Sequence, residues 1–130
     1  MIVLDASAVV ELLLNTAVGA AVARRIRGRP TLASPHLIDV EVAQAVRRLV
    51  RLRQIEPWRG AVAIQHLVEF DLVRFDHVEL LPRIWALRAS LSAYDAAYLT
   101  LAEVLDAPLL TCDGRLARAA RGIARVELLR

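Results

Sequence analysis

Acidic side chains stand at the ends of short apolar segments along this sequence. The acids in such positions are Asp5, Asp39, Glu41, Asp76, Asp95 and Asp113. Carboxylates that converge on one place repel each other, so they are costly unless they are protonated or bound to a metal ion. Their hard oxygen atoms suit Mg²⁺ or Mn²⁺. The pattern therefore predicts a divalent-cation site wherever the fold brings several of these acids together.

Each acid also has a local structural explanation. Asp5 is a residue type that caps helix N-termini, and Ser7 is an alternative cap for the same helix. Asp76 is better explained as a cap for the helix after it than as a ligand. Asp113 lies in the segment Thr-Cys-Asp-Gly, where aspartate is also a typical turn residue.

Three further positions stay ambiguous on pattern alone. Ser92 and Asp95 have the spacing of a capping box before an apolar helix, so a capping role competes with a functional one. Asp39 and Glu41 lie two residues apart in one predicted helix and therefore point about 200° apart. Periodicity does not choose which of these two faces a site.

The segments that carry these acids alternate between strands and helices. The predicted strands cover residues 2–4, 31–33, 72–75, 109–112 and 126–128. The predicted helices cover residues 8–14, 17–27, 35–53, 57–70, 78–90, 93–105 and 116–120, and the third and fourth form a hairpin. Strands separated by helices indicate an α/β fold with a mostly parallel sheet and helices on both faces. Ligands of such sheets bind beyond the carboxyl ends of the strands, where Asp5, Asp76 and Asp113 fall.

Composition narrows the possible chemistry. The length of 130 residues fits one domain, so residues 1–130 are expected to form a single domain. All 17 basic residues are arginine, and the absence of lysine excludes a phosphate-binding loop with its lysine and Schiff-base chemistry. A single cysteine, Cys112, excludes an internal disulfide and suits a reducing cytoplasm. Asp5 and Glu11 interrupt the apolar residues 2–23, so we expect neither a signal peptide nor a membrane span.

Four of the acids and their neighbours resemble the motifs of PIN-domain ribonucleases. The matching segments are Met-Ile-Val-Leu-Asp5-Ala-Ser7, Glu41 in a helix after a Ser-Pro step, Leu-Ser-Ala-Tyr-Asp95-Ala-Ala-Tyr-Leu and Leu-Leu-Thr111-Cys-Asp113. The four acids in this order are the specific feature of the match. The chain is more closely similar to the VapC toxins of bacterial toxin–antitoxin pairs, and the resemblance covers essentially its whole length.

The resemblance implies a PIN-like three-layer α/β/α fold and assigns the site. The positions that match the family's metal-binding, catalytic quartet are Asp5, Glu41, Asp95 and Asp113. Ser7 and Thr111 match the hydroxyl positions beside the quartet, where such groups orient the carboxylates. The resemblance thus favours Glu41 over Asp39, and it retains Asp95 despite the capping-box alternative.

The family resemblance also implies an activity and its partners. It implies the toxin of a type II toxin–antitoxin system, an Mg²⁺-dependent endoribonuclease in which Mn²⁺ can substitute. In-line attack by water on the RNA phosphodiester would leave a 5′-phosphate and a 3′-hydroxyl. The expected partners are RNA, a VapB-type antitoxin and a second copy of the chain in a homodimer. The antitoxin would cover the helices around residues 36–53 and 57–69.

A non-catalytic RNA- or protein-binding module with a PIN-like fold is the alternative. Arg47, Arg48 and Arg51 are candidates for contacts with RNA or a partner, although each also fits a solvated helix face. The formal net charge of +3 permits a nucleic-acid role without arguing for one. Trp58 and Trp85 could stack on bases, but tryptophans in apolar helices are usually packing residues, and we expect packing here.

Other catalytic classes fit the sequence less well. His36, His66 and His77 could serve a histidine-dependent nuclease, yet none has an evident partner and surface or structural roles are expected. Cys112 is expected in the core rather than as a nucleophile. A receiver domain needs a lysine, a haloacid-dehalogenase-type phosphatase needs an aspartate where Ser7 stands, and a dinucleotide-binding domain needs a G-x-G-x-x-G segment that is missing.

Overall fold

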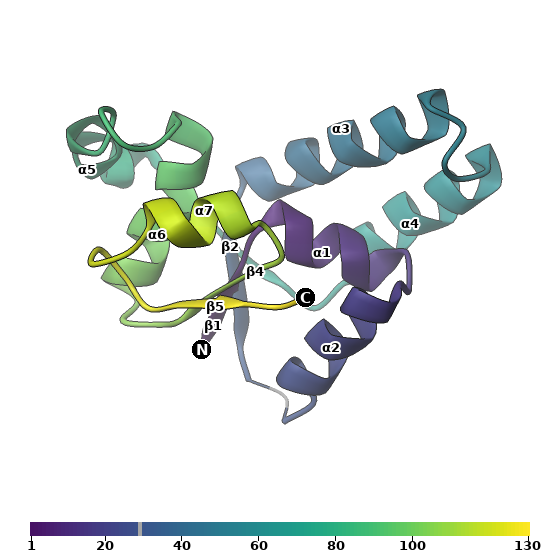
Figure 1. The fold of residues 1–130 in the computed structure, drawn as a ribbon, viewed down its shortest axis with the longest axis horizontal. Helices are drawn as coiled ribbons and strands as arrows, with labels where there is room; N and C mark the ends of the chain where they lie inside the picture. The colour runs from purple at the N-terminus through teal and green to yellow at the C-terminus, as the bar shows by residue number, and fades with distance from the viewer. Residues whose placement is uncertain (29) are drawn as a thin grey trace.

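The structure, a computed structural model, describes residues 1–28 and 30–130 (Figure 1). Within this part the strands are β1 (Ile2–Leu4), β2 (Leu32–Pro35), β3 (Val73–Phe75), β4 (Leu109–Thr111) and β5 (Val126–Leu128). The helices are α1 (Ala6–Leu13), α2 (Ala17–Ile26), α3 (Leu37–Arg51), α4 (Pro57–Glu69), α5 (Leu81–Ala86), α6 (Ala93–Val104) and α7 (Gly114–Ala119), with a 3₁₀ helix η1 (Val78–Leu80) before α5.

Strand β1 occupies the centre of an all-parallel sheet with the order β3-β2-β1-β4-β5. Val3 pairs with Ala33 of β2 on one side and with Leu109 of β4 on the other. Every residue of β1 is buried, as its unbroken apolar run requires in a parallel sheet covered on both faces. The strand order changes direction at β1, so the carboxyl end of β1 is the point where ligands of such sheets bind.

The helices pack in two groups around this sheet. Helix α1 packs with α2, α3 and α4, and the α3–α4 hairpin extends away from the sheet (Figure 1). Helix α6 packs with α5 and against β1, β2 and β4, and its residues from Ala96 to Ala102 are buried. The expected α/β/α arrangement with a parallel central sheet is confirmed.

Helix α3 is amphipathic and carries one of the predicted site acids. Ile38, Val42 and Val46 recur at helical spacing and are buried. Glu41 precedes Val42 by one residue, so it lies at the border of this apolar stripe and is half-buried. The packing of α3 therefore fixes the direction in which Glu41 points.

Three predicted helix starts are wrong, and α7 begins at Gly114 rather than at residue 116. Helix α1 begins after Asp5, whose Oδ1 accepts the backbone N–H of Ala8 at 2.9 Å, so Asp5 and not Ser7 caps it. Strand β2 continues to Pro35, where a helix start is predicted. The backbone N–H of His36 donates to the Phe75 carbonyl at 2.9 Å, and this continued contact with β3 delays α3.

The predicted helix over residues 78–90 is shorter in the structure. Residues Val78–Leu80 form a 3₁₀ turn, and the α-helix covers only Leu81–Ala86. Pro82 lies in the first turn of α5, the place where a residue without an N–H leaves no helical hydrogen bond unmade. The proline therefore divides the apolar segment into two short pieces.

Helices α1 and α2 meet at a sharp bend of 107°. Among the described residues, no single helix has the length and apolar composition to cross a membrane, although this bent pair taken together would pass that test. Gly19 lies where α2 approaches α1. A Cβ at this position would stand 2.0 Å from the carbonyl oxygen of Glu11, so the contact needs a residue without a side chain.

Replacing Gly19 by alanine should force the two helices apart, because the carbonyl it would overlap belongs to the backbone of α1. We expect the free energy of unfolding in urea to fall by about 2–3 kcal/mol, as for an overpacked core. Gly28→Ala is the matched control, since a Cβ there meets nothing within 4 Å. Equal stability of the two variants would show that α1 and α2 are not held at this distance.

Candidate active site

Asp5 lies at the junction of β1 and α1, at the carboxyl edge of the sheet, and is only 4% exposed. Its Oδ1 accepts hydrogen bonds from the Ala8 backbone N–H at 2.9 Å and from the Ser7 hydroxyl at 2.7 Å. Its Oδ2 accepts one from the Thr111 hydroxyl at 2.5 Å. Burial raises the pKa of Asp5, while these hydrogen bonds oppose the rise because they stabilise the charged form.

The hydroxyl groups of Ser7 and Thr111 tie Asp5 to the end of β4. The Ser7 oxygen accepts the Cys112 backbone N–H at 2.9 Å, and the Thr111 oxygen accepts that of Asp113 at 2.9 Å. Each hydroxyl that accepts a backbone N–H can turn its own hydrogen toward the carboxylate. Both side chains thus hold Asp5 in one orientation.

Glu41 reaches the same place from α3. Its Oε1 is buried and has no hydrogen-bond partner among the described residues. Burial raises the pKa of Glu41 to about 7, and the negative charges of Asp95 and Asp5 add to the rise. The three carboxylates belong to residues that line one common cleft.

Asp95 and Asp113 stand at the N-terminal ends of α6 and α7. The Ser92 hydroxyl accepts the Asp95 backbone N–H at 3.1 Å, while the Asp95 carboxylate accepts the Arg115 guanidinium at 2.9 Å. Asp113 caps α7 by accepting the backbone N–H groups of Arg115 at 2.8 Å and Leu116 at 3.3 Å, and its other oxygen lies 3.1 Å from the same guanidinium. The capping box at Ser92 is half formed, which leaves the Asp95 carboxylate free to face the other acids.

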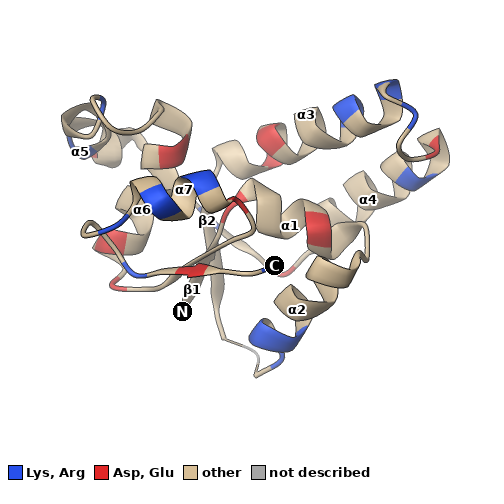
Figure 2. Cartoon of the chain, viewed as in Figure 1, with Lys and Arg blue, Asp and Glu red and all other residues tan. Residues whose placement is uncertain are grey.

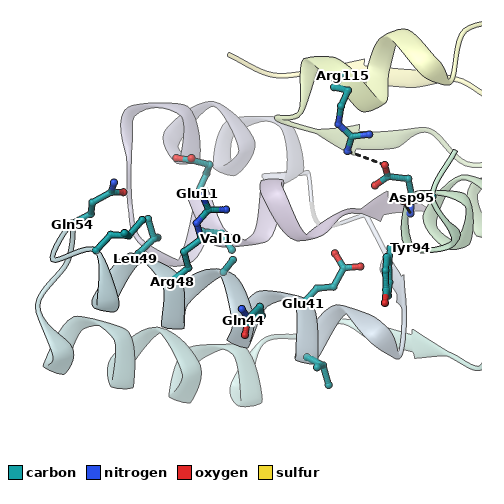
Figure 3. Close-up of a pocket in the computed structure, with 14 residues that line it drawn as sticks. Val10, Glu11, Glu41, Gln44, Arg48, Leu49, Gln54, Tyr94, Asp95 and Arg115 are labelled. Carbon is teal, nitrogen blue, oxygen red and sulfur yellow. Dashed lines mark hydrogen bonds and ion pairs between the residues drawn. The ribbon is translucent and has the colours of Figure 1, made fainter.

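All four predicted site acids line one cleft of about 730 Å³. A groove of about 890 Å³ continues from it along α3 and shares Glu41, Arg48, Asp95 and Arg115 with the cleft. In Figure 3 the carboxylates of Glu41 and Asp95 point into the space between their helices, and Arg115 approaches Asp95 from the other side. The structure therefore brings the predicted quartet together at the carboxyl edge of the sheet.

Comparison with known proteins places this chain in a family. The PIN domain model matches residues 2–122. The chain is 44% identical over 129 residues to Ribonuclease VapC12 of Mycobacterium tuberculosis, with 99% of each chain covered. The chain belongs to the VapC family of PIN-domain ribonucleases. It is also 42% identical over 116 residues to Ribonuclease VapC9 of the same organism, covering 89% of this chain and 88% of VapC9.

Solved structures share the fold of this VapC-family chain. PAE2754 from Pyrobaculum aerophilum aligns with a TM-score of 0.70 and 26% identity, over 96% of this chain and 89% of that one. VapBC2 from Rickettsia felis, solved bound to a DNA fragment from its promoter, aligns with a TM-score of 0.71 over the full length of both chains. At 13% identity the second likeness speaks for the fold alone.

The donor atoms of the VapC-family cleft fit a hard divalent cation. Among the described residues, no three His, Cys, Asp or Glu side chains are already gathered closely enough to hold an ion. The buried Oε1 of Glu41 nevertheless lacks a partner, and an unsatisfied buried oxygen is costly. An ion among Asp5, Glu41 and Asp95 would supply that partner and offset both the burial of the Glu41 charge and its repulsion by Asp95 and Asp5. The residues present therefore fit a hard divalent cation.

The other candidate acids lie elsewhere. Asp39 forms an ion pair with Arg74 at 2.8 Å, and Asp39 does not line the cleft. Asp76 accepts the Val78 backbone N–H at 2.9 Å, although the N-cap position of the following 3₁₀ helix is His77; this hydrogen bond is the main reason that the pKa of Asp76 is lowered. Between Asp39 and Glu41, only Glu41 reaches the site.

The three candidate arginines separate in the structure. Arg47, Arg48 and Arg51 are all exposed, but only Arg48 lines both the cleft and the groove. Arg48 follows Glu41 by seven residues and so lies about 20° from it around α3, whereas Arg47 lies about 120° away. Figure 2 shows basic positions gathered at the tip of the α3–α4 hairpin, away from the sheet.

Two expectations about single residues are wrong. Trp58 and Trp85 are 65% and 68% exposed, so neither packs in the core; Arg88 stacks over the Trp85 ring at 4.7 Å from its centre. Cys112 is half-buried and lines the cleft rather than lying wholly inside the core. Burial raises the pKa of Cys112 to about 11, which favours the protonated thiol near neutral pH.

No histidine is among the described residues that line the cleft. His36 and His66 are exposed and His77 is half-buried, and none of them lines the cleft as described. Sequence reasoning missed Arg115 and Tyr98, which do line it. Its position two residues after Asp113 could have indicated Arg115. Tyr98 could have been found because it follows Asp95 by three residues and so shares a helix face with it.

The pKa of Glu41 gives this site a pH signature. A folded-state pKa of about 7 against the ordinary 4.5 means that the folded protein retains a proton that the unfolded chain releases. The free energy of unfolding should therefore fall as pH rises between these two values. Glu41→Gln should lose this part of the pH dependence in metal-free urea unfolding, whereas Glu79→Gln, on an exposed residue, should keep it. Identical profiles for wild type and Glu41→Gln would contradict the burial of Glu41.

Proposed function

We propose that this chain is the toxin of a type II toxin–antitoxin system and acts as a metal-dependent endoribonuclease. The observation that supports the proposal most strongly is the convergence of Asp5, Glu41, Asp95 and Asp113 on one cleft. Its support from the family is the 44% identity to a VapC ribonuclease over nearly the whole chain.

The four acids would hold Mg²⁺, with Mn²⁺ as a substitute. The ion, when bound, supplies positive charge at the phosphodiester and lowers the pKa of water. The chain's own contribution is orientation: Ser7 and Thr111 fix the Asp5 carboxylate by hydrogen bonds of 2.7 Å and 2.5 Å. Such orienting contacts matter for metal affinity because a carboxylate free to rotate must lose that freedom on binding. The expected products carry a 5′-phosphate and a 3′-hydroxyl.

Arg48 is the candidate for contact with the RNA backbone next to the acids. It is exposed and lines both the cleft and the groove. Arginine carries a permanent charge and a planar donor group that matches phosphate. Arg47 and Arg51 are proposed for contacts farther along the RNA or with a protein partner, because they lie outside the cleft lining.

The groove along α3 is proposed as the antitoxin site. Val10, Val40, Leu49 and Leu52 line it, with Val40 74% exposed and Leu52 55% exposed. An apolar segment of a VapB-type antitoxin laid there would also cover the adjoining cleft. We further propose a homodimer, since the large apolar side chains of Val78, Leu81 and Trp85 are all exposed. A cytoplasmic location would give such a toxin access to its RNA.

Cleavage of total RNA by the purified chain with Mg²⁺ or Mn²⁺ tests the proposal. We expect Asp5→Asn and Asp95→Asn to lower the rate by at least about 100-fold, because each removes a charge that the ion needs. EDTA should abolish cleavage, and sequencing of the ends should identify a 5′-phosphate and a 3′-hydroxyl.

Asp76→Asn is the matched control, because this exposed aspartate lies outside the cleft and asparagine can still accept the Val78 N–H. Equal cleavage by wild type and both site variants would refute the site, and cleavage that persists in EDTA would favour a metal-independent nuclease. RNA or protein binding without cleavage would support the non-catalytic alternative.

Arg48→Ala and Arg47→Ala form a second matched pair on one helix. Arg48→Ala should raise the RNA concentration needed for half-maximal cleavage by about three- to tenfold, since one phosphate contact near the acids is lost. Arg47→Ala removes the same charge and should change the RNA concentration needed for half-maximal cleavage by less than about twofold. Steady-state cleavage at fixed salt measures both, and equal effects would argue against a specific contact by Arg48.

A further inference from the structure

The Arg115 guanidinium forms ion pairs with two of the four site acids, Asp95 and Asp113. Its Nη2 atom lies 2.9 Å from an Asp95 oxygen and 3.1 Å from an Asp113 oxygen. One nitrogen therefore bridges two acids that come from α6 and from the end of β4. The other side-chain nitrogens of Arg115, Nε and Nη1, form no hydrogen bond with the described residues.

The bridge is poorly suited to a structural role. The Arg115 side chain is 64% exposed, and ion pairs in such positions contribute little to stability because water screens them. Helix α7 does not need the guanidinium, since the Asp113 carboxylate already caps it through the backbone N–H groups of Arg115 and Leu116. The bridge does, however, occupy one oxygen of Asp95 and one of Asp113, and both acids line the cleft.

The same oxygens would be needed by a divalent ion. Asp95 Oδ2 and Asp113 Oδ2 accept the guanidinium, so a cation bound by both oxygens would have to compete with it. A guanidinium set free at this position would remain at the mouth of the cleft, because Arg115 lines the cleft and the adjoining groove. Its flat group of N–H donors suits a phosphate that approaches the acids.

We propose that Arg115 and the divalent ion are alternative partners of Asp95 and Asp113, and that ion binding frees the Arg115 guanidinium to contact a phosphate of the RNA. The inference rests on the proposed function, because it assumes that these acids bind the ion and that RNA enters the cleft. Arg115 then has two opposite effects: it weakens ion binding in the free protein and strengthens RNA binding in the ion-bound protein.

Two measurements on the same variants test this pair of effects. Calorimetric titration with Mn²⁺ alone should show about three- to tenfold tighter binding to Arg115→Ala than to wild type, as expected for loss of a solvent-exposed competitor. Steady-state cleavage of total bacterial RNA at saturating Mn²⁺ should show a half-saturating RNA concentration about three- to tenfold higher for Arg115→Ala, with a smaller change in the maximal rate. Arg115→Lys, which keeps the charge, should fall between wild type and alanine in both.

Arg118→Ala is the matched control, because Arg118 is an exposed arginine one turn along α7 and forms no ion pair with an acid among the described residues. It should resemble wild type in both measurements. Damage to the fold would weaken Mn²⁺ and RNA binding together, so only the opposite changes support the proposal. Unchanged or weaker Mn²⁺ binding by Arg115→Ala, or an unchanged half-saturating RNA concentration, would overturn it. A wild-type chain that binds no Mn²⁺ and cleaves no RNA would refute the proposed function itself.

Discussion

The buried carboxylate of Asp5 is the constraint on which the rest of the site depends. A carboxylate that is 4% exposed needs hydrogen-bond donors, and here they come from the first turn of α1 and from the end of β4. Ser7 and Ala8 are local donors, whereas Thr111 is in reach only while β1 and β4 keep their pairing, in which Leu4 stands beside Leu110. One side chain thus couples the start of a helix, the register of two strands and the orientation of a site acid.

The arrangement of the acids around Asp5 lowers the stability of the folded protein but gives the site its capacity to bind a cation. Glu41 is held half-buried with an oxygen that lacks a partner among the described residues, and burial first, then the charges of Asp95 and Asp5, raise its pKa to about 7. An apolar side chain in its place would remove that cost, so the packing of α3 alone does not explain the glutamate. Arg115 offsets the negative charges of Asp95 and Asp113, but it forms no ion pair with Asp5 or Glu41 among the described residues. A divalent ion would relieve both.

Sequence patterns predicted the parallel sheet because each strand is a short apolar run between amphipathic segments, and β1, whose residues are all buried, follows this rule closely. Boundaries were less predictable where tertiary contacts decide them, as where the pairing of His36 with Phe75 extends β2. Periodicity did not separate Asp39 from Glu41, because the deciding contact is with Arg74 from another strand. The exposure of Trp85 was equally unpredictable, since the sequence pattern does not distinguish a buried from an exposed apolar residue until the neighbouring elements are known.

Capping and site roles, which compete when the sequence is considered alone, coincide in the fold. Asp5 caps α1, Asp113 caps α7 and Asp95 lies in the first turn of α6, so three helix N-termini meet at the carboxyl edge of the sheet. The partial positive charge at a helix N-terminus favours a carboxylate there and offsets some of the repulsion among neighbours. Glu41 lies beyond the first turn of α3 and lacks this help, and its pKa is raised to about 7. The geometry of parallel strands followed by helices thus accounts both for the gathering of the acids and for which of them remains unsatisfied.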